Sequence, residues 1–552
     1  MMTYKFVNLS PEQIEARRHA LDRAGWHAWL SPVVLLVVVY VCRRLLFWSP
    51  GTRELRRIGW VLETTYVSEF GPLSVQLFGL AYTAWLLFLV FRGTGEDYMH
   101  LTKAFGHVGV SQMPLQYLMS VKWTALSPVA AATGLSHEKV NVYHRFLGRV
   151  VHLFLGIHAV LYLRFFAKMG WLEKRVRDWD VRFGLLAFWT VNFLGVLSLP
   201  AVRRRAYHAL FWRSHIVLAL ALPVFVFWHV KWTRLYVGQV AVVWVLNVVT
   251  RRFWAGEVVQ VRSEDLQGTT GSNTTRQLVQ VKMSVRQGGR LAKATPGQHV
   301  YVHAPDGGGV KNPFTVVSVT DSHPKDGVVE VMLVVRRLGG PGTKWLAEVA
   351  KTGKKVDIRV EGPYGDAGDH VDRLVNVETT GPVLLVAGGV GATYTIPIYM
   401  ALLSKARRQG VQRNVKMVWL VKSVADAAWG VEVLRRHLPV TEMDVDVYVT
   451  GESANMSLAP TQDSNMVSGG GKLLGFKIHT LGERPSIAPM VDNFFAASAA
   501  GRQHDFNADE VNVFVCGPAS LSADLRKAMG RHVNASGIKL RWIEEVFGFG
   551  GS

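Results

Sequence analysis

The sequence predicts a multi-domain membrane protein, with an N-terminal α-helical transmembrane bundle of about seven spans and a soluble half that contains an antiparallel β-barrel and an α/β domain. Long apolar runs precede Arg251-Arg252, and such runs can cross a hydrocarbon core about 30 Å thick. After these arginines, short alternating strands separated by Gly and Pro turns replace the runs. A buried strand, a Gly-rich turn and a helix then follow at 382–402, which indicates an α/β domain.

The composition also favours a membrane protein over a nucleic-acid-binding one. The 552 residues carry a formal net charge of +21, but 49% of them are hydrophobic and gather in the long runs. The basic excess is then expected in loops, where it favours an anionic membrane surface, and we expect no nucleic-acid partner. The two cysteines, Cys42 and Cys516, exclude a disulfide framework and a cysteine-based zinc site.

Seven apolar runs are candidate spans, at 30–47, 73–91, 108–131, 143–165, 183–199, 209–230 and 236–249. The third run is the least regular, because Gln112, Gln116 and Lys122 interrupt it. These runs define a transmembrane domain at 29–254. The preceding segment, 1–28, is polar and mixed in charge, so we do not interpret it as a signal peptide.

Basic residues near the span ends predict the orientation. Arg43-Arg44, Arg203–Arg205 and Arg251-Arg252 lie on one side if all seven spans are real, which places the soluble half in the cytosol. The loop at 164–182 is also basic and would lie outside. Either its acidic residues offset that charge, or the loop attracts anionic metal chelates.

Two spans carry histidines with the same spacing. His144 and His158 are 14 residues apart, and so are His215 and His229. Fourteen residues correspond to roughly 21 Å of helix and return to within about 40° of the same face. A lone histidine is usually a packing residue, but ionisable residues inside spans are costly and two matched pairs indicate function. Two stacked haems would fit between facing pairs, His144 with His215 and His158 with His229. Two imidazoles per iron leave no open position, which favours electron transfer.

These helices carry a family resemblance. The run YHRFLGRVVHLFLGIHAVLY at 143–162 resembles the haem helix of the ferric reductase and NADPH oxidase superfamily, and RRRAYHALFWRSH at 203–215 resembles its second haem helix. The seven-span layout is more similar to that of the fungal metalloreductases than to that of the six-span NADPH oxidases. The resemblance implies a cytosolic ferredoxin-reductase-like half that binds FAD and NADPH, together with two b-type haems in the bundle.

The first domain of this half is expected at 255–375, with strands at 257–262, 278–285, 299–304, 314–320, 328–336 and 355–360. One of these strands resembles the family's flavin-binding motif, Asn312-Pro313-Phe314-Thr315-Val316-Val317-Ser318. His usually precedes Pro-Phe-Thr in the family, and the amide of Asn312 cannot supply a cation. A Gly-rich turn after Arg336-Arg337 resembles the pyrophosphate segment. There either arginine is a candidate ligand, and Thr343 opens a helix whose N-terminus suits phosphate.

The second domain is expected at 376–552, with an insertion at 453–471 that is expected to be disordered. Its Gly-rich turn resembles the nucleotide turn of ferredoxin-reductase-like domains and contains Gly388, Gly389, Gly391, Ala392 and Thr393. Lys422 and Ser423 follow the next strand, where they either hold a 2′-phosphate, which would favour NADPH over NADH, or form an ordinary solvated loop.

Two further segments resemble parts of the family's catalytic centre. Cys516-Gly517-Pro518 corresponds to a turn that lies near the reactive carbon of nicotinamide, although Cys516 also fits a small buried hydrophobic residue. The family usually ends in an aromatic residue, commonly Trp, that stacks on the flavin. Here Phe547 or Phe549 would serve, and we take Cys516 and Phe549 as the candidate catalytic residues.

The predicted function is electron transfer across a membrane, most simply the plasma membrane, with an endomembrane as the alternative. Electrons would pass from NADPH to FAD, to the inner and then the outer haem, and finally to extracytosolic ferric or cupric chelates. One alternative is a superoxide-generating NADPH oxidase, with dioxygen as the acceptor. Another is a non-catalytic membrane scaffold with a degenerate reductase domain, which the departure at Asn312 and the unusual C-terminus would favour.

Overall fold

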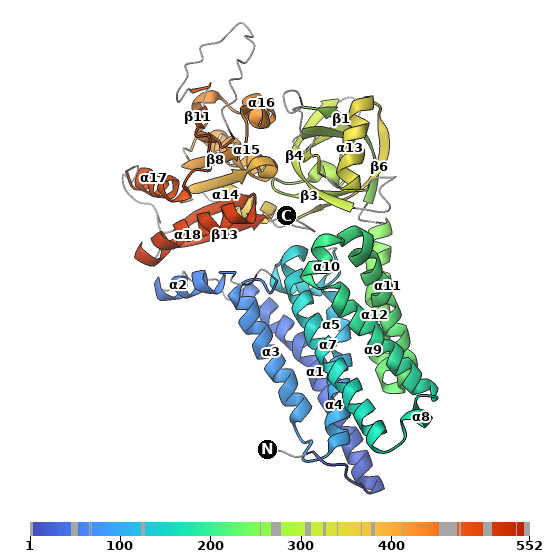
Figure 1. Cartoon of the computed structure of the whole chain (residues 1–552). Helices are drawn as coiled ribbons and strands as arrows, with labels where there is room; N and C mark the ends of the chain where they lie inside the picture. The colour runs from blue at the N-terminus through green and yellow to red at the C-terminus, as the bar shows by residue number, and fades with distance from the viewer. Residues whose placement is uncertain are drawn as a thin grey trace. The chain divides into compact units, whose positions relative to one another are not determined.

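The computed structural model describes residues 4–45, 53–65, 67, 69–122, 127–253, 256–266, 278–303, 311–323, 327–338, 340–365, 367–376, 381–411, 413–451, 472–473, 476–500, 510–536 and 538–545 (Figure 1). It divides into two compact units. The first comprises Met1–Gly51, Val61–Trp254 and Gly548–Ser552, and the second comprises Thr52–Trp60 and Ala255–Phe547. The predicted insertion at 453–471 and the two C-terminal candidates, Phe547 and Phe549, lie outside the described residues.

The first unit is a helical bundle. Among the described residues, six helices are long and apolar enough to cross a membrane, at Pro11–Leu45, Leu73–Phe91, His137–Lys168, Trp179–Leu197, Leu210–His229 and Lys231–Phe253. In this bundle α7 (His137–Lys168) packs against α3 (Leu73–Phe91), α4 (Tyr98–Ser111) and α9 (Trp179–Leu197), and α9 also packs against α11 (Arg213–His229). The remaining long helices are α1 (Pro11–Leu45) and α12 (Arg234–Phe253).

The predicted third span is wrong in position and continuity. The chain forms α4 and then α5 (Met113–Leu118), so no single helix covers 108–131. Asp97 sets the start of α4, because its side chain accepts hydrogen bonds from the backbone N–H groups of Met99 and His100. Gln112 lies between the two helices, and its side chain hydrogen-bonds to the Ala28 carbonyl at 2.7 Å and to the Tyr82 hydroxyl at 2.7 Å. A polar residue in this run is therefore a buried link to α1 and α3.

Short elements connect the long helices. They are α2 (Arg53–Leu62), α6 (Pro128–Thr133), α8 (Leu172–Arg175), α10 (Pro200–Arg205), the π-helical turn η2 (Tyr207–Trp212) and the 3₁₀ turn η3 (Lys231–Thr233). Within the bundle, α8 lies at the end where α7 finishes and α10 lies at the opposite end (Figure 1).

The second unit begins with the predicted barrel, and all six predicted strands are confirmed. They are β1 (Gly256–Asp265), β2 (Leu278–Arg286), β3 (His299–His303), β4 (Lys311–His323), β5 (Val328–Arg336) and β6 (Val356–Tyr364). The strands close in the order β1-β2-β5-β4-β3-β6 and every pairing is antiparallel. Alternate residues fill the interior, as the period of two requires, and α13 (Pro341–Thr352) packs against β1 and β2.

A seven-stranded sheet forms the predicted α/β domain. Its order is β10-β11-β9-β8-β7-β12-β13, and all neighbours are parallel except the short edge strand β10. The strands are β7 (Val383–Gly388), β8 (Val415–Val421), β9 (Val445–Val449), β10 (Lys472–Leu473), β11 (Phe476–Thr480), β12 (Glu510–Cys516) and β13 (Lys539–Glu545). The helices are α14 (Ala367–Asn376), α15 (Ala392–Gln409), α16 (Ala428–His437), α17 (Ile487–Ala500) and α18 (Ala519–Ser536). The chain proceeds from β7 to β8 on one side and places β12 on the other, and such a switch point is where ligands bind at the carboxyl ends of strands.

Candidate functional sites

Helices α7 and α11 bring the four predicted histidines together in two pairs. The ring centroids of His144 and His215 lie 6.4 Å apart, and those of His158 and His229 also lie 6.4 Å apart. When two imidazoles bind one metal ion from opposite sides, each metal–nitrogen bond is about 2 Å long and each ring centroid lies about 1 Å beyond its nitrogen. The two ring centroids are then roughly 6 Å apart. Both pairs therefore have the spacing of a shared metal. We call His144 and His215 the inner pair, and His158 and His229 the outer pair.

The Nδ1 atom of each histidine has a partner on the protein. Those of His144, His158 and His229 lie 3.0, 2.8 and 2.7 Å from the backbone carbonyl oxygens of Gln116, Thr102 and Asp180, respectively. The Nδ1 of His215 lies 3.4 Å from the hydroxyl of Ser198. A carbonyl oxygen accepts only from a protonated nitrogen, so the contacts of His144, His158 and His229 favour the tautomer whose Nε2 keeps the lone pair that a metal would take.

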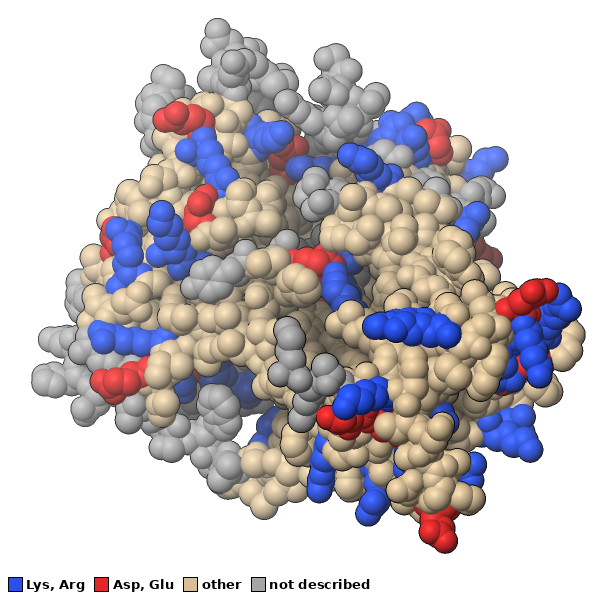
Figure 2. Space-filling model, turned by 60° about the horizontal axis from the view of Figure 1, so that its bottom comes forward, with Lys and Arg blue, Asp and Glu red and all other residues tan. Residues whose placement is uncertain are grey.

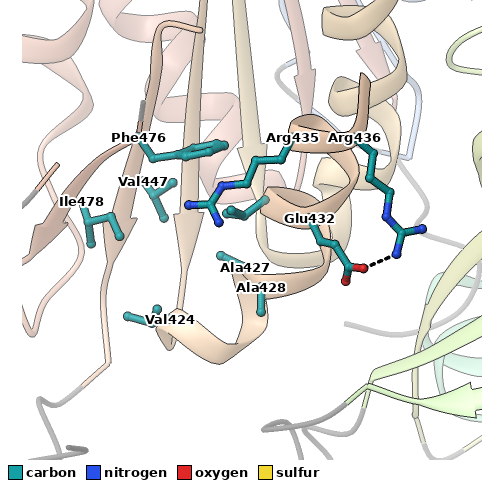
Figure 3. A pocket seen from close by; sticks show the side chains of 10 residues that line it. Val424, Ala427, Ala428, Glu432, Arg435, Arg436, Val447, Phe476 and Ile478 are labelled. Atoms are coloured by element: carbon teal, nitrogen blue, oxygen red, sulfur yellow. Dashed lines mark hydrogen bonds and ion pairs between the residues drawn. The ribbon is translucent and has the colours of Figure 1, made fainter. Parts of the chain in front are cut away.

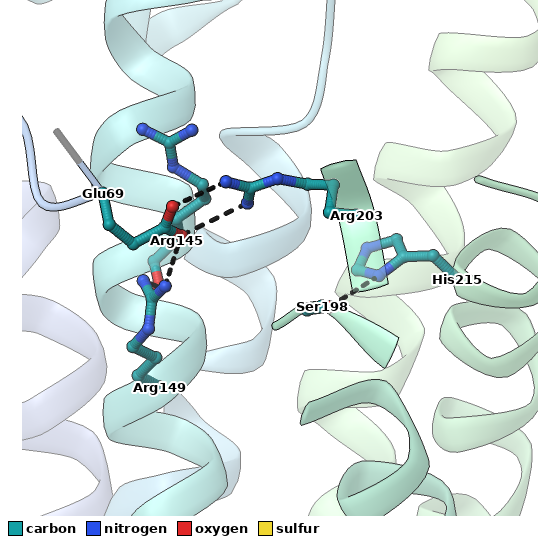
Figure 4. Close-up of polar contacts among 6 residues, drawn as sticks. All are labelled: Glu69, Arg145, Arg149, Ser198, Arg203 and His215. Carbon is teal, nitrogen blue, oxygen red and sulfur yellow. Dashed lines mark hydrogen bonds and ion pairs between the residues drawn. The ribbon is translucent and has the colours of Figure 1, made fainter. Parts of the chain in front are cut away.

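The end of α7 near the inner pair carries a cluster of charges. Arg203 of α10 makes two hydrogen bonds to the Glu69 carboxylate, at 2.6 and 3.2 Å, and Arg149 of α7 donates to the same carboxylate (Figure 4). Burial alone would raise the pKa of Glu69, but the hydrogen bonds from Arg203 and Arg149 outweigh it and lower that pKa. Glu69 therefore stays ionised and ties α10 to α7.

His152 faces another helix. Its Nε2 lies 3.2 Å from the side-chain oxygen of Asn192 on α9. It is eight residues from His144, roughly 80° round the helix, so this placement away from the paired histidines agrees with its position on α7.

The basic loop at the α8 end is partly paired within itself. Arg175 pairs with Asp178 and Asp180, and Arg177 pairs with Glu173. Figure 2 shows the face with this end forward, where several Lys and Arg side chains lie beside acidic ones with broad uncharged areas between them. The acidic residues of the loop thus offset part of its charge.

In the barrel, an aromatic cluster lies beside the predicted flavin motif. His299 pairs in register with Thr315 and with Tyr364. Tyr301 lies two residues further along β3, and its ring centroid is 5.5 Å from those of both His299 and Tyr364. The sequence reasoning missed His299 and Tyr301. The alternation in β3 carried the signal, because Val300 and Val302 fill the barrel interior and leave the other face to these rings.

Some residues of the flavin motif pack in the protein core, and others make polar contacts. Thr315 and Val316 are buried, Val316 belongs to the barrel core, and Val317 packs into the core that contains α15. The Asn312 amide lies against Gly342 in the first turn of α13, where a Cβ would clash with it. The Thr343 hydroxyl bonds to backbone atoms of Leu338 and Gly340, so it closes the Gly-rich turn.

Of the two candidate arginines, Arg336 points to the nucleotide turn. A Cβ at Gly389 would lie 3.1 Å from a terminal nitrogen of Arg336, so the guanidinium lies against that turn. The Arg336 Nε is buried and makes no hydrogen bond among the described residues. A buried guanidinium nitrogen of this kind fits an anionic group such as pyrophosphate.

Two strand-to-helix turns meet at the switch point. A Cβ at Gly388 would lie 2.7 Å from Pro518, and one at Gly391 would clash with the Cys516 carbonyl, so glycine is required for this close approach. Trp419 of β8, which sequence reasoning missed, donates from its indole nitrogen to the Gly389 carbonyl at 2.9 Å. Ala392 and Thr393 are buried at the start of α15, and the Thr393 hydroxyl bonds to the Val390 carbonyl.

Cys516 ends β12 with its side chain buried. Burial, together with the nearby Glu545 and Glu544, raises the pKa of its thiol. The side chain is therefore a neutral thiol. This agrees with the interpretation of Cys516 as a small buried hydrophobic residue.

Beyond β8, Lys422 is exposed, whereas the Ser423 hydroxyl accepts from the Asp426 N–H at 3.3 Å. Arg484 bonds to Ser520 and Asp524 near the start of α18. An apolar groove of about 420 Å³ lies next to this region between α16, β9 and β11 (Figure 3). Arg435 lies over the ring of Phe476 at one wall and Glu432 pairs with Arg436 at another. None of the predicted nucleotide residues lines this groove.

Two parts of the chain match known protein families. Residues 105–226 match the family described as "Ferric reductase like transmembrane component", and residues 381–529 match "Ferric reductase NAD binding domain". The first match includes His144, His158 and His215 and ends just before His229, and the second includes both glycine turns. These two parts of the chain are similar to the ferric reductase family.

The chain is similar to "Probable cell surface ferric reductase kap2" of Aspergillus oryzae. They are 27% identical over 355 residues, which cover 60% of this chain and 44% of the relative. It is also similar to "Ferric/cupric reductase transmembrane component 7" of Saccharomyces cerevisiae, with 25% identity over 335 residues that cover 59% of this chain and 50% of the relative. The chain thus spans about half the length of these relatives.

Proposed function

We propose that the chain is an NADPH-dependent reductase of ferric or cupric chelates that works across a membrane. The two matched histidine pairs carry this proposal, because each has the spacing of a shared metal and each Nδ1 has a partner on the protein. Histidines that only pack would need neither the spacing of a shared metal nor an Nδ1 partner, and here both features occur in both pairs. The two matches to ferric reductase families support the same function.

The inner and outer pairs would each hold one b-type haem. When bound, FAD would accept a hydride from NADPH and release single electrons, and the two haems would conduct them through the bundle. The protein's part is to fix ring orientation through the Nδ1 hydrogen bonds and to leave no open coordination position. This donor set suits electron transfer.

The second unit would bind FAD and NADPH. Thr315 and the buried cluster of His299, Tyr301 and Tyr364 would support the flavin from beneath, and Arg336 offers a cation for pyrophosphate. The turns at Gly388–Gly391 and Cys516–Pro518 would bring nicotinamide to the flavin from the switch point. Lys422 would favour NADPH by contacting its 2′-phosphate.

The acceptor would be a ferric or cupric chelate outside the cytosol, as the names of the relatives suggest. Arg203–Arg205 and Arg251-Arg252 flank the last two spans and so lie on one side of the membrane, which supports a cytosolic second unit, and the plasma membrane is the simplest location.

The test is to purify the full chain in detergent and to measure its haem and flavin content, its visible spectrum and its reduction of ferric citrate with NADPH. We expect about two haems and one flavin per chain, a b-type spectrum, and reduction that superoxide dismutase does not inhibit. Inhibition by superoxide dismutase would instead indicate an oxidase that produces superoxide. A chain without haem and flavin would contradict both functions and indicate a scaffold.

A further inference from the structure

The outer histidines contact their neighbouring helices in the same way. The Nδ1 of His158 lies 2.8 Å from the Thr102 carbonyl oxygen on α4, and a Cβ at Gly106 would lie 2.7 Å from the His158 ring. The Nδ1 of His229 lies 2.7 Å from the Asp180 carbonyl oxygen in the first turn of α9, and a Cβ at Gly184 would lie 2.7 Å from the His229 ring. In both cases the glycine follows the carbonyl residue by four positions.

Helix geometry explains this spacing. In an α-helix, residue i+4 lies above residue i on the same face, and its Cα–Cβ bond tilts back toward residue i. An imidazole that reaches the carbonyl of residue i must therefore pass over the Cα of residue i+4. A contact of 2.7 Å is closer than a Cβ tolerates. Only glycine leaves room for the ring at these two positions.

The inner pair is held differently. His144 contacts the Gln116 carbonyl near the end of the short helix α5, and His215 contacts the Ser198 hydroxyl. Neither contact has a glycine four residues later, since Ser120 follows Gln116 and Val202 follows Ser198 at that spacing. A change at Gly106 or Gly184 should therefore act on the outer pair alone.

We propose that Gly106 and Gly184 are positioning residues for the outer pair, whose missing side chains determine whether His158 and His229 can ligate one metal together. This inference rests on the proposed function, because it takes that metal to be a haem iron. A methyl group at either glycine pushes the ring off its carbonyl partner, and the two Nε2 atoms then no longer face a common centre.

The test is to introduce Gly106→Ala and Gly184→Ala separately in the full chain and to measure haem per chain and the low-spin haem signals by electron paramagnetic resonance. We expect haem to fall from about two to about one per chain, with the signal of one haem retained. Alanine has the higher helix propensity, so the substitution does not weaken the helix itself. Wild-type haem content with unchanged signals in both variants would overturn the inference.

The chain offers matched controls. A Cβ at Gly156 of α7 or at Gly238 of α12 would meet nothing within 4 Å, so alanine there should keep both haems. Gly195 of α9 is the sharper control, because a Cβ there would clash with His152, which belongs to neither pair. Gly195→Ala should lower stability yet retain both haems. If it loses a haem as Gly184→Ala does, the effect is general packing damage and the inference is wrong.

A double variant keeps the test decisive if alanine also disturbs folding. Gly106→Ala combined with His158→Ala should lose no more haem than His158→Ala alone, because both changes remove the same ligand. Additive loss would contradict a positioning role. Wild-type protein that lacks haem altogether would instead contradict the proposed function, so the two failures are distinguishable.

Discussion

Arg203, at the end of the bundle near the inner pair, donates hydrogen bonds of 2.6 and 3.2 Å to the carboxylate of Glu69. Arg149 donates to the same carboxylate from α7, the helix that carries His144. Arg203 lies on α10, which precedes α11 and His215. One carboxylate therefore joins the two helical segments that position the inner pair.

Glu69→Gln should destabilise the bundle. The substitution leaves two guanidinium groups facing each other without the negative charge between them, and losing charge-assisted bonds at a mostly buried site costs about 2–3 kcal/mol. Thermal unfolding followed by the haem absorbance would measure the loss. The matched control is Glu96→Gln, since Glu96 pairs with Lys5 at an exposed site where a salt bridge contributes less than about 1 kcal/mol. Equal effects of the two substitutions would contradict this assignment.

The same carboxylate predicts a dependence on pH. The pKa of Glu69 is held below its ordinary value of 4.5, so its ionised form is favoured in the folded state. Its contribution to stability is therefore fully present above about pH 4.5 and is lost as the pH falls through the lowered pKa. Unfolding temperatures of wild type and Glu69→Gln should differ near pH 7 and converge under acidic conditions. A difference that stays constant as the pH falls would rule out this linkage.

The features that the sequence predicted correctly are those that the geometry of a single helix or strand determines. The 14-residue spacing predicted the two histidine pairs because helix pitch is the same in every context, and alternation predicted all six barrel strands. It failed where distant segments decide the outcome. Gln112 was interpreted as an interruption of a span, but its partners Ala28 and Tyr82 come from other helices. Gly106 and Gly184 matter for the site only because α4 and α9 pack against the histidines, which the sequence alone does not show.

Ser198→Ala should weaken the inner site without affecting the outer one. The Ser198 hydroxyl is the contact of the His215 Nδ1, at 3.4 Å, and removing a partner that orients a ligand typically costs 10- to 100-fold in metal affinity. We expect about tenfold faster loss of one haem to apomyoglobin, with the second haem unchanged. Ser214→Ala is the control, because the Ser214 hydroxyl bonds back to the Leu210 and Phe211 carbonyls. Faster loss of both haems would contradict a local role for Ser198.

Arg336→Gln should weaken FAD binding. The Arg336 Nε is buried and makes no hydrogen bond among the described residues, and a charge-assisted bond to phosphate contributes about 1.5–3 kcal/mol, or roughly tenfold or more in affinity. Titrating FAD into deflavinated protein by fluorescence would measure the change. Arg337→Gln is the matched control at the adjacent position. If Arg337→Gln weakens FAD binding as much as Arg336→Gln does, Arg336 is not the specific pyrophosphate ligand.

Lys422→Ala should reduce the preference for NADPH over NADH. Lys422 is exposed at the carboxyl end of β8, where a 2′-phosphate would be within reach of its ammonium group. Only NADPH carries that phosphate, so the KM for NADPH should rise about five- to tenfold while the KM for NADH stays the same. Lys416→Ala removes an equal charge from β8, but Lys416 is paired with Asp446 at 2.9 Å and should leave the ratio of the two KM values unchanged. A parallel rise in both KM values for Lys422→Ala would show that the lysine acts on general electrostatics, because a specific phosphate contact cannot affect NADH.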